Sequence, residues 1–229
     1  MSNLKIGLLS VVLLFVANGA FAQESEKKDT VKVPESVQVL KLASELAVYG
    51  YKNNAVLPLI QAVDLYLSVA TKDLKIEAVE KGQGSETSKK SSVSFDASKI
   101  LSDAKELAAL ESTPAAYLAL ISDLEKKAKD QTRSPIDGAS KTYERVKAYS
   151  SDSYVVRFNA YERAYIEVYG DGDTDLDLYI YDNYGNLVAS DTSVSYNAGG
   201  WFVPTCTCPY KIVVKNNGRV YNDYVLYVY

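Results

Sequence analysis

Two different spacings of hydrophobic residues divide the chain. Over residues 34–130, apolar side chains recur every three to four positions, a spacing that places them on one face of an α-helix. Over residues 151–229, apolar and polar side chains alternate, which places them on opposite faces of β-strands. We therefore expect an α+β protein of two domains, an all-α half followed by an antiparallel β-sandwich.

The helical domain is expected to contain four helices arranged as two hairpins. Asp96 is a candidate N-cap for the third helix, and Thr113 followed by Pro114 has the composition that opens a fourth helix, ending near Lys129. A polar loop at residues 82–92 separates the hairpins. The apolar stripes that support the first hairpin are Val39, Leu42, Ala43, Leu46 and Ala47, then Leu59, Ala62, Val63 and Tyr66.

The two hairpins are similar to each other at an offset of 61 residues, the step from Ala43 to Ala104. Within the 18 positions from residue 43 to residue 60, eight are identical in both copies: Ala43, Glu45, Leu46, Ala47, Ala55, Leu57, Leu59 and Ile60. A helix–turn–helix unit used twice resembles tetratricopeptide-type hairpins in architecture, although the Trp, Gly and Tyr marks of that family are missing. A four-helix bundle without repeat ancestry is the alternative.

The sandwich is expected at residues 151–229, after a linker at residues 131–150 that contains Pro135 and Gly138 and lacks the helical period. Turn sequences rich in Gly, Asn and Asp separate about eight short strands, which favours an antiparallel sandwich. The inward-facing residues of the first clear strand should be Ala164, Ile166 and Val168.

The first 22 residues have the layout of a bacterial-type signal peptide. Lys5 precedes an apolar run at residues 6–16, and Ala20-Phe21-Ala22 is a small-x-small cleavage signal. The run is too short to span a bilayer. We expect cleavage after Ala22, export to the periplasm or the extracellular space, and a flexible lead-in at residues 23–33.

The amino-acid composition argues against several classes of function. The chain contains no histidine, so the commonest general base and the commonest zinc ligand are both missing. Its net charge of −4 without a basic stripe argues against a nucleic-acid partner, because few groups would neutralise phosphates. No apolar stretch after the signal is long enough for a membrane span. We expect no catalytic residues and no enzyme activity.

Residues 150–229 resemble bacterial pre-peptidase C-terminal domains. The resemblance rests on GDGDTDLDLYIYD at residues 170–182, GNLVASD at residues 185–191, and YKIVVKNNG at residues 210–218 followed by YVLYV at residues 224–228. It implies a jelly-roll-like β-sandwich found in secreted bacterial proteins, usually as a non-catalytic appendage to a protease, with calcium bound in some members. This chain departs from the family's setting because a helical half, and no peptidase, precedes the module.

Four aspartates are the candidate metal ligands: Asp171, Asp173, Asp175 and Asp177. They recur at every second residue, and on one strand they would form a face of mutually repelling carboxylates unless a cation bound there. Calcium prefers oxygen ligands in a flexible loop, and Gly170 and Gly172 would permit such a loop. The alternative is a solvated turn in which these carboxylates accept hydrogen bonds from the backbone or from tyrosines. Calcium is the only cofactor that we consider.

Cys206 and Cys208 are separated by one residue. They are candidates for a small-ring disulfide, with free or intermolecular thiols as the alternative.

Six tyrosines could form an exposed aromatic platform for a peptide, a glycan or a partner strand, or could serve in cross-strand packing: Tyr165, Tyr169, Tyr179, Tyr181, Tyr227 and Tyr229. We expect a non-enzymatic exported binding or scaffolding protein, with the helical hairpins as the interaction surface, the sandwich as an accessory module, and a protein or cell-surface polymer as partner. The alternative is an accessory subunit of a secreted protease or glycosidase, or a cryptic hydrolase that uses carboxylates.

Overall fold

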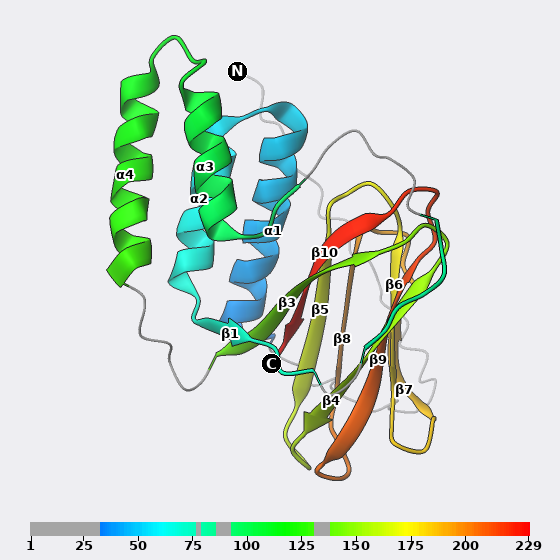
Figure 1. Ribbon diagram of the computed structural model, residues 1–229. Helices are drawn as coiled ribbons and strands as arrows, with labels where there is room; N and C mark the ends of the chain where they lie inside the picture. Colours follow the sequence, from blue (N-terminus) through cyan, green and yellow to red (C-terminus); the bar gives the residue numbers. More distant parts are fainter. Residues whose placement is uncertain (1–32, 77–78, 86–92, 131–137) are drawn as a thin grey trace, which may run out of the picture. The chain divides into compact units, whose positions relative to one another are not determined.

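The computed structural model of the protein describes residues 33–76, 79–85, 93–130 and 138–229. The helices and strands of this part of the chain are shown in Figure 1. The predicted signal peptide and the lead-in, apart from Val33, lie outside the described residues.

Four helices form in the first half, as the periodicity predicts. The Asp96 carboxylate accepts a hydrogen bond from the backbone N–H of Lys99 at 2.9 Å and caps the third helix, and the fourth begins at Pro114. The helices are α1 (Glu35–Asn53), α2 (Val56–Ser68), α3 (Ala97–Ala108) and α4 (Pro114–Asp130).

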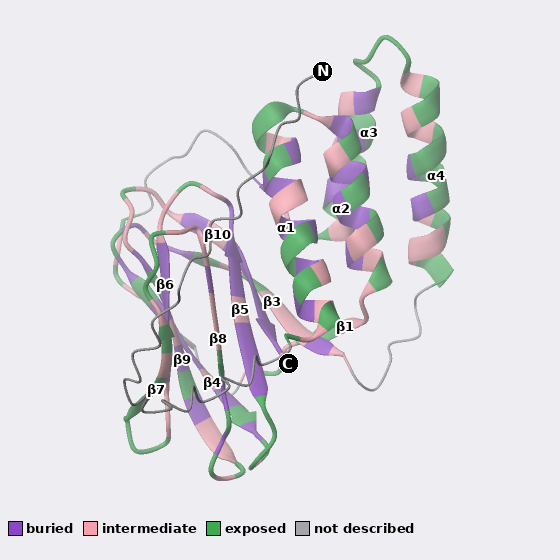
Figure 2. Cartoon of the chain, turned by 180° about the vertical axis from the view of Figure 1, so that it is seen from behind, coloured by how far each residue is buried: buried purple, intermediate pink, exposed green. Residues whose placement is uncertain are grey.

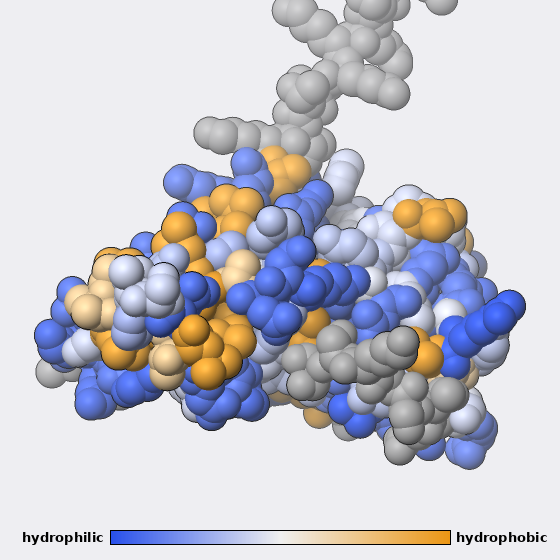
Figure 3. All heavy atoms as spheres, turned by 90° about the horizontal axis from the view of Figure 1, so that it is seen from above, coloured by the Kyte–Doolittle hydropathy of each residue, from blue (hydrophilic) through white to orange (hydrophobic). Residues whose placement is uncertain are grey.

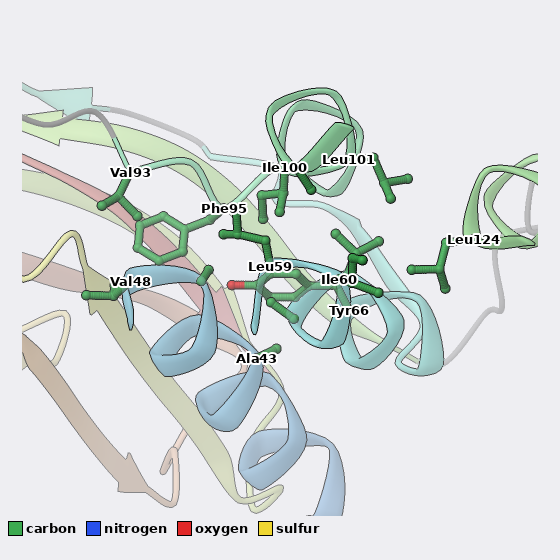
Figure 4. Packing of buried hydrophobic residues seen from close by; sticks show 14 of the residues in the cluster. Ala43, Val48, Leu59, Ile60, Tyr66, Val93, Phe95, Ile100, Leu101 and Leu124 are labelled. Carbon is green, nitrogen blue, oxygen red and sulfur yellow. The ribbon is translucent and has the colours of Figure 1, made fainter. Parts of the chain in front are cut away.

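Small residues let the helices approach one another. A side chain at Gly50 of α1 would collide with Leu59 of α2, and Ala43 and Ala104, the equivalent positions of the two hairpins, are both fully buried. Val93 and Phe95, from the segment before α3, fill the space beside α1 and α2 (Figure 4). The core of the helical half therefore contains residues from the segment before α3 as well as the apolar stripes of the helices.

The two hairpins are not equivalent in their surroundings. Leu59 of α2 is fully buried, whereas Leu120, its equivalent in α4, is 46% exposed. α4 buries only two residues among those described, Ile121 and Leu124. Because the last helix lacks a neighbour on one side, its apolar residues reach the surface. The tetratricopeptide-type resemblance stays a prediction.

The second half forms a sandwich of two sheets. Sheet A has the order β1-β3-β10-β5-β8 and sheet B the order β2-β4-β9-β6-β7. From β3 to β10 this is the eight-stranded jelly roll, in which neighbouring strands are antiparallel and successive strands alternate between the sheets, except that β6 and β7 form a hairpin within sheet B. These strands are β3 (Ala139–Val146), β4 (Ser151–Phe158), β5 (Ala164–Gly170), β6 (Leu176–Tyr181), β7 (Leu187–Asp191), β8 (Asn197–Phe202), β9 (Cys208–Asn216) and β10 (Asn222–Val228). The α+β fold, with helices followed by a β-sandwich, is confirmed.

Three strands lie where the sequence predicts none. β1 (Thr71–Asp73) and β2 (Val79–Glu80) come from the segment between the hairpins and add one strand to each sheet, β1 in parallel with β3. β3 lies inside the stretch that we predicted as a linker. It shows no clear alternation because Thr142 and Glu144, rather than apolar residues, pair with the inward-facing Leu226 and Tyr224 of β10.

The helices pack on the outer face of sheet A. On β10, Leu226 and Val228 point into the sandwich, whereas Val225 and Tyr227 join the hydrophobic cluster of the helices. Tyr169 of β5 joins the same cluster, and β5 is buried on both faces over most of its length (Figure 2). The helical half and the sandwich therefore share a core within the compact unit of residues 33–229.

Candidate functional site

The six tyrosines of the proposed platform are divided between the two sheets. Tyr169 and Tyr227 are 1% and 0% exposed beneath the helices, and Tyr165 and Tyr229 also belong to sheet A or its end. Tyr179 and Tyr181 lie on the outward side of β6 in sheet B and are half-buried. The platform that the sequence suggested is therefore at most these two tyrosines.

Around Tyr179 and Tyr181, the outward side chains of sheet B form a surface that we call the sheet-B face. Tyr179 lies beside Val213 of β9, and Tyr181 lies beside Lys211. Across β9, Val155 of β4 pairs with Lys211 from the other side. The members of the sheet-B face are Val155, Tyr179, Tyr181, Lys211, Val213 and Lys215, and all are half-buried or exposed.

The charges of the sheet-B face are largely balanced. Lys211 Nζ lies 3.0 Å from the Glu80 carboxylate, and Lys215 Nζ lies 3.7 Å from the buried Asp177 carboxylate. The Tyr179 hydroxyl donates a hydrogen bond to Asp177 at 3.0 Å, which restrains the ring. The face thus combines two aromatic rings, two valines and paired lysines, a composition suited to packing and hydrogen bonding along an extended ligand.

The four predicted calcium ligands do not share a strand. Only Asp177 lies on one, β6, whereas Asp171, Asp173 and Asp175 are in the loop between β5 and β6, so the alternation argument does not hold for them. Gly172, at φ +83°, turns this loop in a conformation that favours glycine.

Each aspartate also has partners within the protein. The fully buried Asp171 accepts hydrogen bonds from the backbone N–H groups of Asp173 and Asp223 at 3.1 and 2.5 Å. Asp175 accepts from the Ser195 backbone and the Asn217 amide at 2.8 and 3.1 Å. No group of three or more His, Cys, Asp or Glu residues within the described residues could hold a metal ion. The calcium site stays a prediction.

Cys206 and Cys208 form a disulfide bond, with their Cα atoms 5.3 Å apart. Their sulfur atoms lie 3.9 and 3.8 Å from the side-chain oxygen of Asn183, in the loop between β6 and β7. The bridge is therefore part of the loops at one end of the sandwich.

A polar hollow of about 410 Å³, which we did not predict, lies between α1 and the β5–β8 edge of the fold. Burial raises the pKa of Glu167, which lines it, to about 7, although the Tyr169 hydroxyl and Lys41 act in the opposite direction. Burial alone would also raise the pKa of Asp191, but hydrogen bonds from the backbone N–H groups of Gly199 and Ser193 hold it below its usual value. Two carboxylates whose pKa values shift in opposite directions thus line one hollow.

A signal for this hollow is present in the sequence. Glu167 stands between Tyr165 and Tyr169 on the outward side of β5, a carboxylate in an otherwise apolar and aromatic strand. Only the position of α1, which brings Lys41 and Glu45 over the sheet, makes the site a hollow.

No described helix has the length and the hydrophobicity that a membrane crossing requires.

No protein-family model matches the chain, and no curated protein matches it. Similar solved structures include the pre-peptidase C-terminal domain of a collagenase from Bacillus anthracis, with 14% identity over 39% of this chain and 89% of that one and a TM-score of 0.32. The periplasmic g-type lysozyme inhibitor PliG from Aeromonas hydrophila has 11% identity over 39% and 83% of the two chains, with a TM-score of 0.32. A carbohydrate-binding module of Cellvibrio mixtus lichenase 5A has 12% identity over 38% and 85%, with a TM-score of 0.26. Such low values say nothing about the ligand of this chain, and its relation to the pre-peptidase family stays a prediction.

Proposed function

We propose that this chain is a non-enzymatic exported binding or scaffolding protein and that the sheet-B face contacts its partner. The observation that carries the proposal is the unequal burial of the two sheets. The helices cover outward tyrosines of sheet A, whereas Tyr179 and Tyr181 of sheet B keep part of their rings exposed. Exposed aromatic rings on a rigid sheet are favourable binding groups because little conformational entropy is lost when a ligand packs on them.

The partner that fits this face is a protein or a cell-surface polymer in an extended form. Tyr179 and Tyr181 are two residues apart on one strand, so their rings are about 7 Å apart along it and can contact successive units of a chain. Lys211 and Lys215 are paired with carboxylates, which leaves little positive charge for a nucleic acid.

The helical half offers a second surface. Leu110, between α3 and α4, is 83% exposed, and Leu120 of α4 is also exposed. Figure 3 shows hydrophobic residues at the surface among hydrophilic ones. Because the sheet-B face is continuous across three strands, we place the main contact on sheet B.

A co-sedimentation assay with purified peptidoglycan, insoluble polysaccharides and fibrillar protein tests the proposal. We expect the mature protein to sediment with at least one of these polymers, and the double variant Tyr179→Ala/Tyr181→Ala to bind about tenfold more weakly or worse. Tyr49→Ala, which removes an exposed tyrosine from α1, is the matched control and should bind like the unaltered protein.

Two outcomes would contradict the assignment. Unchanged binding in the double variant would remove the sheet-B face as the contact. Loss of binding in Leu120→Asp, with the double variant unaffected, would move the interaction surface to the helices.

The hydrolase alternative has one observation in its favour, the divergent pKa values of Glu167 and Asp191 around the same hollow. Carboxylate pairs of this kind can act as general acid and base. Turnover in a panel of protease and glycosidase substrates that is lost in both Glu167→Gln and Asp191→Asn would establish this alternative over the binding proposal.

A further inference from the structure

The disulfide between Cys206 and Cys208 encloses a single residue, Thr207, in the loop between β8 and β9. A disulfide stabilises a protein mainly by restricting the unfolded chain, and this contribution grows with the length of the enclosed loop. A bridge around one residue therefore does little as a structural staple, and another role has to account for it.

The conformation of this loop is held by contacts that do not depend on the sulfur–sulfur bond. The Thr207 hydroxyl accepts a hydrogen bond from the backbone N–H of Ala160 at 3.0 Å, and the Thr207 carbonyl accepts one from the Arg157 guanidinium at 3.2 Å. Both cysteines are half-buried, but Cys208 begins β9 and packs against the core of the sandwich, whereas Cys206 precedes the strand. Cys208 is thus the cysteine whose backbone is fixed in the sheet, and Cys206 is the one that can move to meet an attacking thiolate.

The surroundings also favour the reduced form. A cation beside a cysteine stabilises its thiolate, and the Arg157 guanidinium is bonded to the residue between the two cysteines. The Asn183 side chain, next to both sulfurs, offers an amide that can turn to donate a hydrogen bond to a thiolate. A small ring is in addition strained, so that the bond is more readily opened by an attacking thiolate.

We propose that Cys206–Cys208 is a thiol–disulfide exchange site that oxidises dithiols. A thiolate of the dithiol attacks the Cys206 sulfur, the Cys206–Cys208 bond breaks, and Cys208 leaves as a thiolate that Arg157 stabilises. The second thiol of the substrate loses its proton to solvent and attacks the mixed disulfide at the substrate sulfur. Two electrons thus pass from the dithiol, which becomes a disulfide, to the cysteines, which become two thiols. The substrate class is a protein or small molecule with two neighbouring thiols.

Reduction of the folded protein by dithiothreitol, followed by maleimide labelling and mass spectrometry, tests the proposal. With about one equivalent of dithiothreitol at neutral pH, we expect most of the protein to gain two labels within minutes while its circular dichroism spectrum stays unchanged. A reduced synthetic peptide with two cysteines should be oxidised at the same time as the protein gains labels. A disulfide that stays largely intact after an hour in excess dithiothreitol would overturn the proposal.

Arg157 is a positioning residue in this scheme, and its charge can be separated from its hydrogen bond. Arg157→Gln should slow exchange about tenfold and shift its pH profile upward, whereas Arg157→Lys should restore most of the rate. Equal rates in all three proteins would refute the role of the charge.

The double variant Cys206→Ser/Cys208→Ser separates the exchange site from a structural bridge and from the proposed binding function. We expect its melting temperature to fall by no more than a few degrees and its polymer binding through the sheet-B face to be unchanged. A large loss of stability would show that the disulfide is structural and would contradict the exchange site, whatever the binding assay gives.

Discussion

The outer faces of sheets A and B carry the same kind of sequence but have different surroundings. Tyr227 of β10 and Tyr179 of β6 both occupy outward positions on alternating strands, yet Tyr227 is fully buried and Tyr179 is not. The difference is the helical layer, which packs on sheet A. An outward tyrosine is therefore a core residue in one sheet and a surface residue in the other, and only the surface set is available for a ligand.

The largest expected effect comes from truncating one tyrosine of each sheet. Tyr227→Ala leaves a cavity between sheet A and the helices and should reduce the free energy of unfolding by about 3–5 kcal/mol. Tyr179→Ala should cost about 1 kcal/mol or less, because its ring is already partly hydrated. Urea denaturation of both variants measures the difference, and similar losses would mean that the helices do not cover sheet A as described.

The pH dependence of stability tests, at Glu167, whether the helices bury the outer face of sheet A. The groups that face Glu167 are Lys41 and Glu45 of α1, together with Asp191, Tyr169 and Tyr229 of the sandwich. Its pKa is about 7 in the folded protein against an ordinary value of 4.5. Well below pH 4.5 the group is neutral in both states. Between pH 4.5 and about 7 the unfolded state ionises while the folded state keeps its proton, so the folded state loses up to about 3 kcal/mol relative to the unfolded state by the time the pH passes 7.

Glu167→Gln should remove this pH dependence. We expect the variant to be more stable than the unaltered protein at pH 8 and about equal to it at pH 4, in urea titrations at both pH values. Parallel stability profiles for the two proteins between pH 4 and pH 8 would show that Glu167 ionises as a solvated group.

Thermal melting in calcium and in chelator tests the calcium site predicted in the loop that joins β5 of sheet A to β6 of sheet B. Calcium that binds only the folded protein, at a hundredfold excess over its Kd, adds about 2.7 kcal/mol of stability and should raise the melting temperature by several degrees over that in chelator. Magnesium should do much less because it demands a stricter geometry. Equal melting temperatures in calcium and in chelator would contradict the calcium site. The role of Asp171 and Asp175 would then be to accept hydrogen bonds from neighbouring loops.

The smallest expected effect compares two tyrosines on the two faces of one strand. The Tyr224 hydroxyl forms a buried hydrogen bond with the Tyr154 hydroxyl inside the sandwich, whereas the Tyr227 hydroxyl has no hydrogen-bond partner among the described residues. Tyr224→Phe should therefore cost about 1–2 kcal/mol, and Tyr227→Phe should be neutral or slightly stabilising. Thermal melting of the two variants checks this, and an equal loss in both would indicate that the Tyr227 hydroxyl is satisfied, for example by buried water.

Local sequence was sufficient to predict most of the helices and strands. The N-cap at Asp96, the proline at the first position of α4 (Pro114) and the alternation around Ile166 depend on neighbouring residues, and the corresponding helices and strand are present. β3 and β1 were missed because they are polar and hold their places through backbone hydrogen bonds to distant strands. The polar hollow was missed for a related reason, since Glu167 and Lys41 are brought together by the packing of α1 on sheet A.

Which residues share a side of each helix and strand could be predicted from the amino-acid order, because the periods of 3.6 and two follow from backbone geometry alone. The amino-acid order also shows that histidine chemistry is missing, since no position holds a histidine. Which side of each sheet is buried could be learned only from the packing of the helices on the sandwich. Burial depends on what packs against a face, and for Tyr169 and Tyr227 the covering residues, such as Val48 and Tyr66, come from helices more than 100 residues earlier in the chain.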